Sequence, residues 1–196
     1  MVKISKILLS ILYLLILSQN CYAEDNFYET KKNIKVLYNT NRLKEAYQMI
    51  SQMDEYMRDA EIWLLAANIT QDYGRDLDAV YLLQKSISSD PKYYKAYYNL
   101  GNIYLKENKY NSAISNYKKC VKYNPNFSYA WYNMGNAYFQ LEEYHKAKSA
   151  YKKAISITNN DADFYYNLAL TYKKLNKNKQ AKKTLEIYDK LKNNVN

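Results

Sequence analysis

Asparagine recurs at a fixed spacing in this sequence, and its side chain is well suited to binding a polypeptide backbone. Two series of three asparagines run through the chain with 34 residues between members: Asn99, Asn133 and Asn167, and then Asn68, Asn102 and Asn136. A carboxamide offers two N–H donors and an acceptor oxygen, so it can bond both the C=O and the N–H of a peptide. Because residues three apart share a helix face, we expect the six side chains to form a ladder along one surface, the asparagine ladder.

A tyrosine precedes each member of the first series, at Tyr98, Tyr132 and Tyr166. Tyrosine rings supply rigid apolar contact area and a hydroxyl at low cost in conformational entropy. Lys95 is the basic residue expected on the same surface. These residue types predict a surface that holds an extended segment of another protein with low sequence specificity. A second interpretation stays open, because asparagine is common throughout this chain and the ladder could bond neighbouring helices instead of a ligand.

The sequence lacks the residues that most catalytic and metal-binding sites need. The chain has three Gly, two Cys and one His, His145. No glycine-rich phosphate-binding loop can be written from three glycines, and one His with two Cys does not make a zinc cluster. No nucleophile and base stand at a spacing that differs from chance. We therefore predict a protein that is not an enzyme, with no cofactor and no metal.

Residues 1–23 have the pattern of a secretory signal peptide. Lys3 and Lys6 precede an uncharged run over residues 7–17, and small residues lie at alternate positions before Glu24. This order is typical of a cleaved export signal, and the apolar run is shorter than the roughly 20 residues that span a bilayer. Cleavage after Ala23 is the favoured interpretation. The alternative is lipidation of Cys21, because residues 17–21 resemble a relaxed bacterial lipoprotein box. Either route predicts an exported protein, periplasmic or membrane-associated in a bacterial envelope.

The charge balance is basic, with 29 Lys and Arg against 19 Asp and Glu. Removal of Lys3 and Lys6 with the signal leaves the remaining chain at +8. Export makes nucleic acid a poor candidate partner for this charge, so we predict none. An acidic protein or an anionic membrane surface fits the charge better. The eight lysines between Lys173 and Lys192 are expected to form a solvated terminal face.

The elements that must position the ladder repeat with the same period. Three blocks share an aromatic residue, a large apolar residue three positions later, a small residue next to it and a tyrosine after that. They are Tyr97-x-x-Leu100-Gly101-x-x-Tyr104, Trp131-x-x-Met134-Gly135-x-x-Tyr138 and Tyr165-x-x-Leu168-Ala169-x-x-Tyr172. A weaker copy begins at Trp63, and Ala79, Ala113, Ala147 and Ala181 keep the same 34-residue step. Apolar residues within each unit fall at the spacing of amphipathic helices.

These blocks resemble the tetratricopeptide repeat family, whose length and residue pattern they share. The resemblance implies an all-α solenoid of about five helix-turn-helix hairpins wound into a right-handed superhelix. Its expected units are residues 60–93, 94–127, 128–161 and 162–196, the last with a C-terminal capping helix, after a degenerate hairpin at 24–59. It also implies that the first helices line a concave groove, so the ladder would run along that groove. Family members that grip a terminal carboxylate use basic residues where Tyr98 and Asn99 stand here, which argues against that mode.

Two packing predictions follow from the repeat. Glycine costs about 1 kcal/mol against alanine within a helix, so Gly101 and Gly135 predict close helix–helix approach, with Ala113 and Ala147 as the matching small surface. The aromatic residues that open the blocks occupy the repeat's packing position and are predicted to be core residues. They are Trp63, Tyr97, Trp131 and Tyr165.

The function predicted from these features is that of a non-enzymatic adaptor or scaffold of the cell envelope. It would bind an extended peptide segment in the groove of the solenoid. The alternative is a membrane-tethered lipoprotein or a scaffold that associates with itself as a homo-oligomer.

Overall fold

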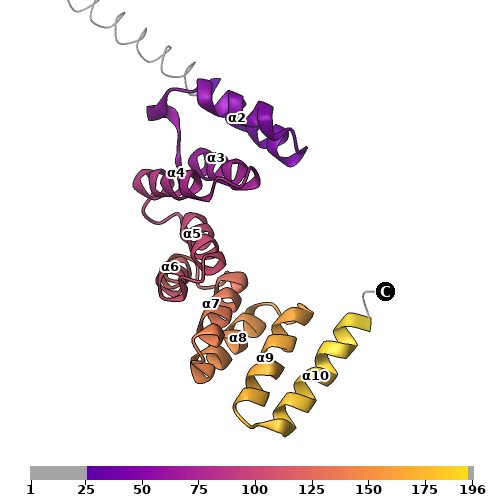
Figure 1. The fold of residues 1–196 in the computed structure, drawn as a ribbon. Helices are drawn as coiled ribbons and strands as arrows, with labels where there is room; N and C mark the ends of the chain where they lie inside the picture. The colour runs from indigo at the N-terminus through magenta and orange to yellow at the C-terminus, as the bar shows by residue number, and fades with distance from the viewer. Residues whose placement is uncertain (1–25, 194–196) are drawn as a thin grey trace, which may run out of the picture.

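The computed structural model describes residues 26–193, which are helical with no strand (Figure 1). The predicted signal peptide and Cys21 lie outside these residues. The first helix includes residues 26–39. The later elements are α2 (Leu43–Gln52), the short 3-10 helix η1 (Glu55–Met57), α3 (Ala60–Asp72), α4 (Asp76–Ser89), α5 (Tyr94–Lys106), α6 (Tyr110–Tyr123), α7 (Ser128–Gln140), α8 (Tyr144–Ile157), α9 (Ala162–Lys174) and α10 (Asn178–Asn193). Within the described range, no helix combines the length and the apolar character needed to cross a bilayer.

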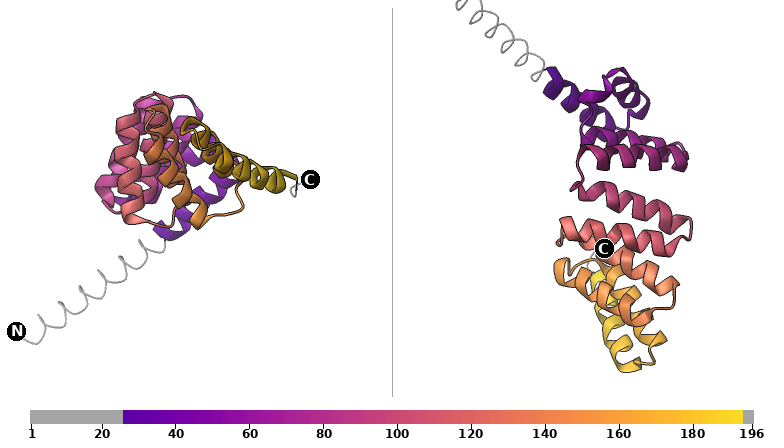
Figure 2. Two further views of the ribbon diagram at one scale, coloured as in Figure 1. Left: turned by 90° about the horizontal axis from the view of Figure 1, so that it is seen from below. Right: turned by 90° about the vertical axis from the view of Figure 1, so that its left-hand side faces the viewer.

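Helices α3 to α10 form four successive hairpins with one spacing. The first helices α3, α5, α7 and α9 begin 34 residues apart, and so do the second helices α4, α6, α8 and α10. Each hairpin packs on the next, and the stack bends so that α2 and α10 both lie to the right of α6 (Figures 1 and 2). The predicted all-α solenoid of helix-turn-helix hairpins is therefore confirmed.

The turn inside each hairpin needs one residue with a left-handed backbone. That residue recurs with the period of the helices, at Gly74, Asn108, Glu142 and Asn176, with φ between 58° and 73°. The following N–H bonds back into the first helix, as from Lys109 to the carbonyl of Tyr104 at 2.8 Å. Glycine and asparagine adopt this conformation readily and fill three of these four positions, so the polar breaks in the sequence favour helix ends there.

The core is a continuous series of clusters between neighbouring helices. Its largest cluster runs from α5 to α9 and includes Tyr117 and Tyr151. Cys120 is buried in it, and burial raises the pKa of its thiol to about 12. A reactive thiol needs a lowered pKa and access to solvent, so Cys120 is a packing residue. Ala154 occupies the same position one repeat later, which agrees with a small buried side chain there.

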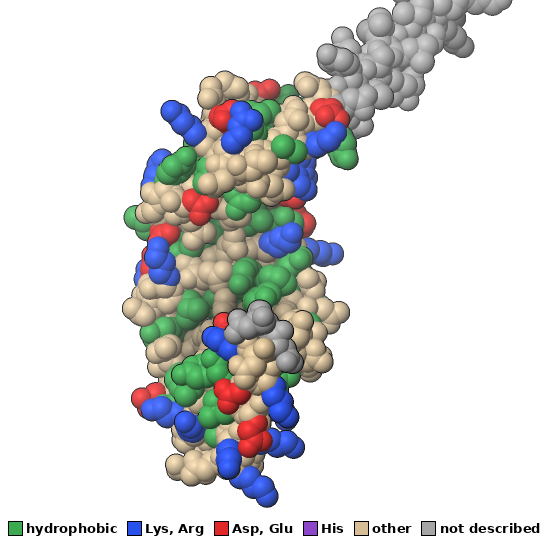
Figure 3. Space-filling model, turned by 90° about the vertical axis from the view of Figure 1, so that its right-hand side faces the viewer, with side chains coloured by type: hydrophobic (Ala, Val, Ile, Leu, Met, Phe, Trp, Pro, Cys, Tyr) green, Lys and Arg blue, Asp and Glu red, His purple; other side chains and the backbone are tan. Residues whose placement is uncertain are grey.

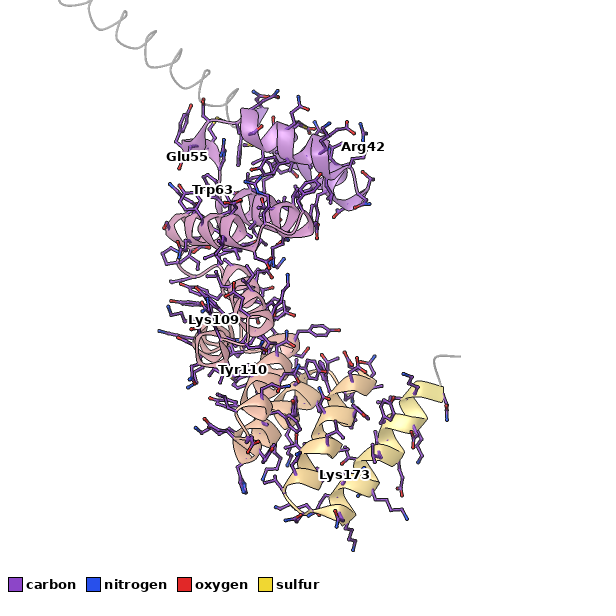
Figure 4. All side chains as sticks on the ribbon, viewed as in Figure 1. Arg42, Glu55, Trp63, Lys109, Tyr110 and Lys173 are labelled. Carbon is purple, nitrogen blue, oxygen red and sulfur yellow. The ribbon has the colours of Figure 1, made fainter. Side chains whose placement is uncertain are left out.

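The N-terminal unit, residues 26–59, joins the stack through a separate cluster. Ile34 and Ile50 pack against Ile62 and Ile69 of α3. Lys31 reaches Asp59 at 2.6 Å and so ties the first helix to the start of α3. Arg42 and Glu55 mark opposite ends of this unit (Figure 4).

The predicted close approach at the mid-helix glycines is confirmed, but its partner differs. A Cβ atom on Gly101 would lie 2.5 Å from a ring carbon of Tyr117, and one on Gly135 would lie 2.7 Å from Tyr151. The second-helix tyrosine ring, rather than Ala113, therefore fills the space above each glycine. In the outer repeats both residues of the pair differ. Alanine stands at the glycine position and leucine at the tyrosine position, as Ala67 with Leu83 and Ala169 with Leu185.

The aromatic packing position is buried in only part of the stack. Trp63 and Tyr97 are each 6% exposed, as predicted. Trp131 and Tyr165 are only half-buried, so their assignment to the core was wrong. Different side chains cover the rings: Tyr123 stacks on Tyr97 at 5.7 Å, and Arg58 lies 5.0 Å from the centroid of the Trp63 ring. At Trp131 the residue in the place of Tyr123 is Ile157.

The glycine–tyrosine contact predicts a compensating pair of substitutions. Gly135→Ala should lower the free energy of unfolding by about 1–3 kcal/mol, because the Tyr151 ring must move. Tyr151→Leu recreates the Ala169 and Leu185 pair found in the next repeat. The double variant should therefore lose about 0.5–3 kcal/mol less unfolding free energy than the sum of the two single losses, measured by urea unfolding.

Ser115→Ala on the exposed face of α6 is the control for this cycle, since it touches neither residue. Paired with Tyr151→Leu it should give additive losses. If the losses from Gly135→Ala and Tyr151→Leu were also strictly additive, the tyrosine ring would not be the reason that residue 135 is a glycine.

Candidate functional site: the asparagine ladder

The ladder asparagines bond to each other between neighbouring repeats. The ninth residue of one first helix accepts a hydrogen bond from the sixth residue of the next first helix. The three rungs join Asn99 Nδ2 to Asn68 Oδ1 at 2.6 Å, Asn133 Nδ2 to Asn102 Oδ1 at 2.9 Å, and Asn167 Nδ2 to Asn136 Oδ1 at 3.0 Å. The structure adds to the prediction of one shared surface that each rung joins one repeat to the next.

Tyrosines of the second helices fix two of these rungs. The hydroxyl of Tyr117 donates to Asn102 Oδ1 at 2.8 Å, and that of Tyr151 donates to Asn136 Oδ1 at 2.7 Å. Burial raises the pKa of both phenols, so each keeps its proton as a donor. The rung at Asn68 has no such donor, because Leu83 stands at the tyrosine position.

Tyrosines of the first helices complete the network. Asn133 Nδ2 donates to the hydroxyl of Tyr98 at 3.3 Å, and Asn167 Nδ2 donates to that of Tyr132 at 2.7 Å. The two rings pack on Phe127 and Phe164, with centroids 4.9 and 4.7 Å apart. Tyr98 and Tyr132 are therefore half-buried parts of the framework. Their spacing in the sequence alone could not distinguish this role from contact with a ligand.

The last tyrosine and the lysine differ from this pattern. Tyr166 is 42% exposed, and its ring lies 5.3 Å from that of Tyr188 on α10. Lys95 is exposed on the first turn of α5. These two side chains, unlike the rungs, can reorient to meet a ligand.

The second interpretation of the ladder, bonding between neighbouring helices, is thus seen directly in the hydrogen bonds. Both N–H groups of the Asn133 and Asn167 carboxamides are used within the protein. A ligand would meet what remains, including the Asn167 oxygen, which accepts no hydrogen bond within the described residues. The contribution of the ladder to ligand binding stays a prediction.

A pocket of about 390 Å³ lies beside the third rung. It holds Asn136, Asn167 and Tyr151 together with side chains that the sequence reasoning did not select. These are Leu105, Asn108, Tyr110, Phe139, Gln140 and Leu170. Tyr110, at the start of α6, lies beside α7 (Figure 4) and lines the pocket together with its residues. The signal that could have found the pocket is the 34-residue step from Leu105 to Phe139, near the ends of α5 and α7.

The pocket, here called the groove pocket, is electrically neutral. None of its lining side chains is a Lys, Arg, Asp or Glu, and α7 has no such residue along its 13 positions. In the space-filling view, apolar and uncharged surface runs down the middle of the molecule, and most Lys and Arg side chains stand toward its edges (Figure 3). The groove pocket itself can offer hydrogen bonds and apolar contacts, but no ion pair.

Residues 26–193 contain no group of three or more His, Cys, Asp or Glu side chains placed to hold a metal ion. His145 is exposed at the start of α8, and its neighbours suggest no role for it as a base or a nucleophile.

Comparisons of the sequence with known families agree with the repeat. A family profile described as "TPR repeat" matches residues 101–142 and 135–176. Two profiles described as "Tetratricopeptide repeat" match residues 82–115 and 162–194. Together these matches extend over residues 82–194, which is more than half of the chain. No curated protein matches the sequence.

Solved structures with a similar fold include several of MamA. The MamA of Desulfovibrio magneticus RS-1 superimposes with a TM-score of 0.75 at 19% identity, over 86% of this chain and 96% of that one. A MamA RS-1 double mutant gives a TM-score of 0.77 at 19% identity, over 87% and 96%. A further crystal structure of MamA gives 0.74 at 22% identity, over 82% and 95%. At these identities, the likeness shows the fold.

The middle rung predicts an energetic coupling between two repeats. Asn133→Ala and Asn102→Ala should each destabilise the protein, but the double variant should lose less than the sum. The expected coupling is about 0.5–1.5 kcal/mol, the net value of a hydrogen bond, measured by a double-mutant cycle in urea.

Asn111→Ala, at an exposed site on α6, is the matched control and should change stability by less than about 0.5 kcal/mol. If Asn102 and Asn133 show no coupling, the rung does not join the repeats and their side chains are free for a ligand.

Proposed function

The chain belongs to the tetratricopeptide repeat family, and from this premise we propose that it is a non-enzymatic protein-interaction scaffold. Its ligand is an extended, mainly uncharged segment of another protein, held along the asparagine ladder and in the groove pocket. The observation that carries the proposal is the neutral lining of that pocket in a chain whose net charge is +10. Charged segments would lose hydration there without an ion pair in return, so the lining favours neutral ones.

Two polar groups in the groove pocket support binding of a peptide backbone. The Asn167 oxygen is an acceptor without a donor in the described protein, and the exposed Gln140 amide offers both donor and acceptor. Each hydrogen bond to a peptide group would contribute about 0.5–1.5 kcal/mol. Phe139, Leu105 and Leu170 add apolar contact for side chains of the segment.

The proposal extends to the cell envelope. The pattern of residues 1–23 supports export, by cleavage after Ala23 or by lipidation of Cys21. The alternative function, a lipoprotein held at an anionic membrane, draws support from the exposed lysines of α10, Lys179, Lys182, Lys183, Lys190 and Lys192. A homo-oligomer is the other alternative.

Photo-cross-linking from the groove pocket tests the scaffold proposal. With p-benzoylphenylalanine in place of Phe139, irradiation should attach a partner through an extended segment poor in charged residues. Adding Gln140→Arg should weaken this capture about ten-fold, because a cation would meet no counter-charge. The substitution lies at the end of α7, where the helix dipole favours a cation, so the fold should persist.

Gln180→Arg on the exposed face of α10 adds the same charge away from the pocket and should leave capture unchanged. Equal loss with both variants would point to net charge rather than the groove. Cross-linked segments rich in Asp and Glu would contradict the proposed ligand.

The export proposal predicts the N-terminus of the protein purified from its own cells. Edman sequencing should begin at Glu24 if the signal is cleaved after Ala23. A blocked N-terminus with the mass of a lipidated Cys21 would favour the lipoprotein alternative. A chain that begins at Met1 in the cytoplasmic fraction would overturn the envelope role.

A further inference from the structure

We propose a second docking site, on the side of α7 opposite the ladder, that binds an acidic segment of a partner protein by taking up one large apolar side chain. It is a pocket of about 550 Å³ between α6, α7 and α8, here called the tryptophan pocket. Its lining residues are Lys118, Val121, Trp131, Met134, Tyr138, His145, Lys146, Ser149 and Ala150. At 100° per residue, Trp131, Met134 and Tyr138 lie on the opposite face of α7 from Asn133 and Asn136.

The floor of the pocket is apolar and fixed. Met134 and Ala150 are each 4% exposed, and Val121 and Tyr138 are each 9% exposed. Trp131 is half-buried, and its indole N–H donates to the carbonyl of Pro125 at 2.9 Å. This hydrogen bond holds the ring in place, so the wall that it forms exists before any ligand arrives. A preformed pocket of this size costs little reorganisation on binding.

A comparison within the chain indicates what the pocket takes up. One repeat earlier, the ring of Tyr123 stacks on Tyr97 at 5.7 Å, and Lys119 lies over the same ring at 5.5 Å. Tyr97 is buried. At Trp131 the residue that corresponds to Tyr123 is Ile157, and no aromatic ring of the described residues stacks on the indole. A partner's apolar side chain can cover Trp131 as Tyr123 covers Tyr97.

The charge around the tryptophan pocket selects an acidic partner. Helices α6 and α8 contain seven lysines and no Asp or Glu. Two of these lysines, Lys118 and Lys146, line the pocket from opposite sides. Glu143 pairs with Lys146 from the preceding turn, so Lys118 is the less compensated of the two. Carboxylates on either side of an inserted apolar residue would meet both lysines.

The shape of the pocket favours a protein segment over a membrane. Three helices wall it, so a side chain can enter it, whereas the headgroups of a bilayer would contact the outer lysines and leave the apolar floor uncovered. The groove pocket is neutral and this pocket is basic, so the two surfaces of α7 would accept segments of different character. One partner could then be held on each side.

Trp131 supplies the readout for the test. In a Trp63→Phe protein, Trp131 is the one tryptophan, because the chain has two. The probe is a short synthetic peptide with one central leucine flanked by Asp and Glu, titrated at about 0.15 M salt, where surface charges are screened beyond about 8 Å. We expect saturable binding that reduces quenching of Trp131 fluorescence by acrylamide.

Lys118→Glu with Lys146→Gln should weaken binding at least about ten-fold. Lys182→Glu with Lys183→Gln makes the same charge change at exposed sites on α10 and should leave binding unchanged. Circular dichroism and melting curves of both double variants should match the parent. The Gln140→Arg variant of the groove should also leave binding unchanged, which separates this site from the proposed scaffold groove.

Three results would overturn the inference. Equal weakening by the α10 variant would assign the effect to net charge. Equal binding of a peptide with serine in place of leucine would show that the pocket takes up no side chain. Protection of Trp131 by vesicles of phosphatidylglycerol and phosphatidylcholine, without protection by the peptide, would assign the surface to a membrane.

Discussion

One contact sets the geometry of the central repeats: a second-helix tyrosine ring lies directly on a first-helix glycine and ends in a hydrogen bond to a ladder asparagine. Gly101 admits the ring of Tyr117 because it has no Cβ, and the same ring carries its hydroxyl to Asn102. Asn102 then accepts from Asn133 of the next repeat. The absence of one side chain thus couples packing inside a hairpin to the alignment between hairpins.

Much of this could be predicted from the sequence, because the period and the mid-helix glycines are local patterns. The pairing of Asn102 with Asn133 could not, since it depends on the separation of two first helices and not on the spacing along either one. The burial of Trp131 was wrongly predicted for a similar reason. The exposure of that ring depends on a residue 26 positions later in the sequence. There the repeat has Ile157, whereas the preceding repeat has Tyr123.

Charge is segregated by helix in the middle of the stack. Helix α7 has no charged side chain, whereas its neighbours α6 and α8 have lysines and no carboxylates. A first helix contacts its own hairpin partner and the adjacent repeats, so charged residues there would be costly to bury. The second helices present a broader outer surface, where lysines stay hydrated. Solenoid packing therefore accounts for the neutral middle of the first helices, and α3, α5 and α9 carry their charged residues only in their first and last turns.

The use of the asparagines within the protein is compatible with binding along the same surface. A carboxamide that donates both N–H groups to fixed partners, as Asn167 does to Tyr132 and Asn136, has its oxygen held in one direction. A ligand then meets an acceptor whose rotamer entropy was lost on folding, and the association does not bear that cost again. The ladder ends at Leu170, where the next ninth-position asparagine would stand, so this oriented acceptor lies beside apolar surface. Structural hydrogen bonding thus fixes, before any ligand arrives, the acceptor that the proposed peptide segment would meet in the groove pocket.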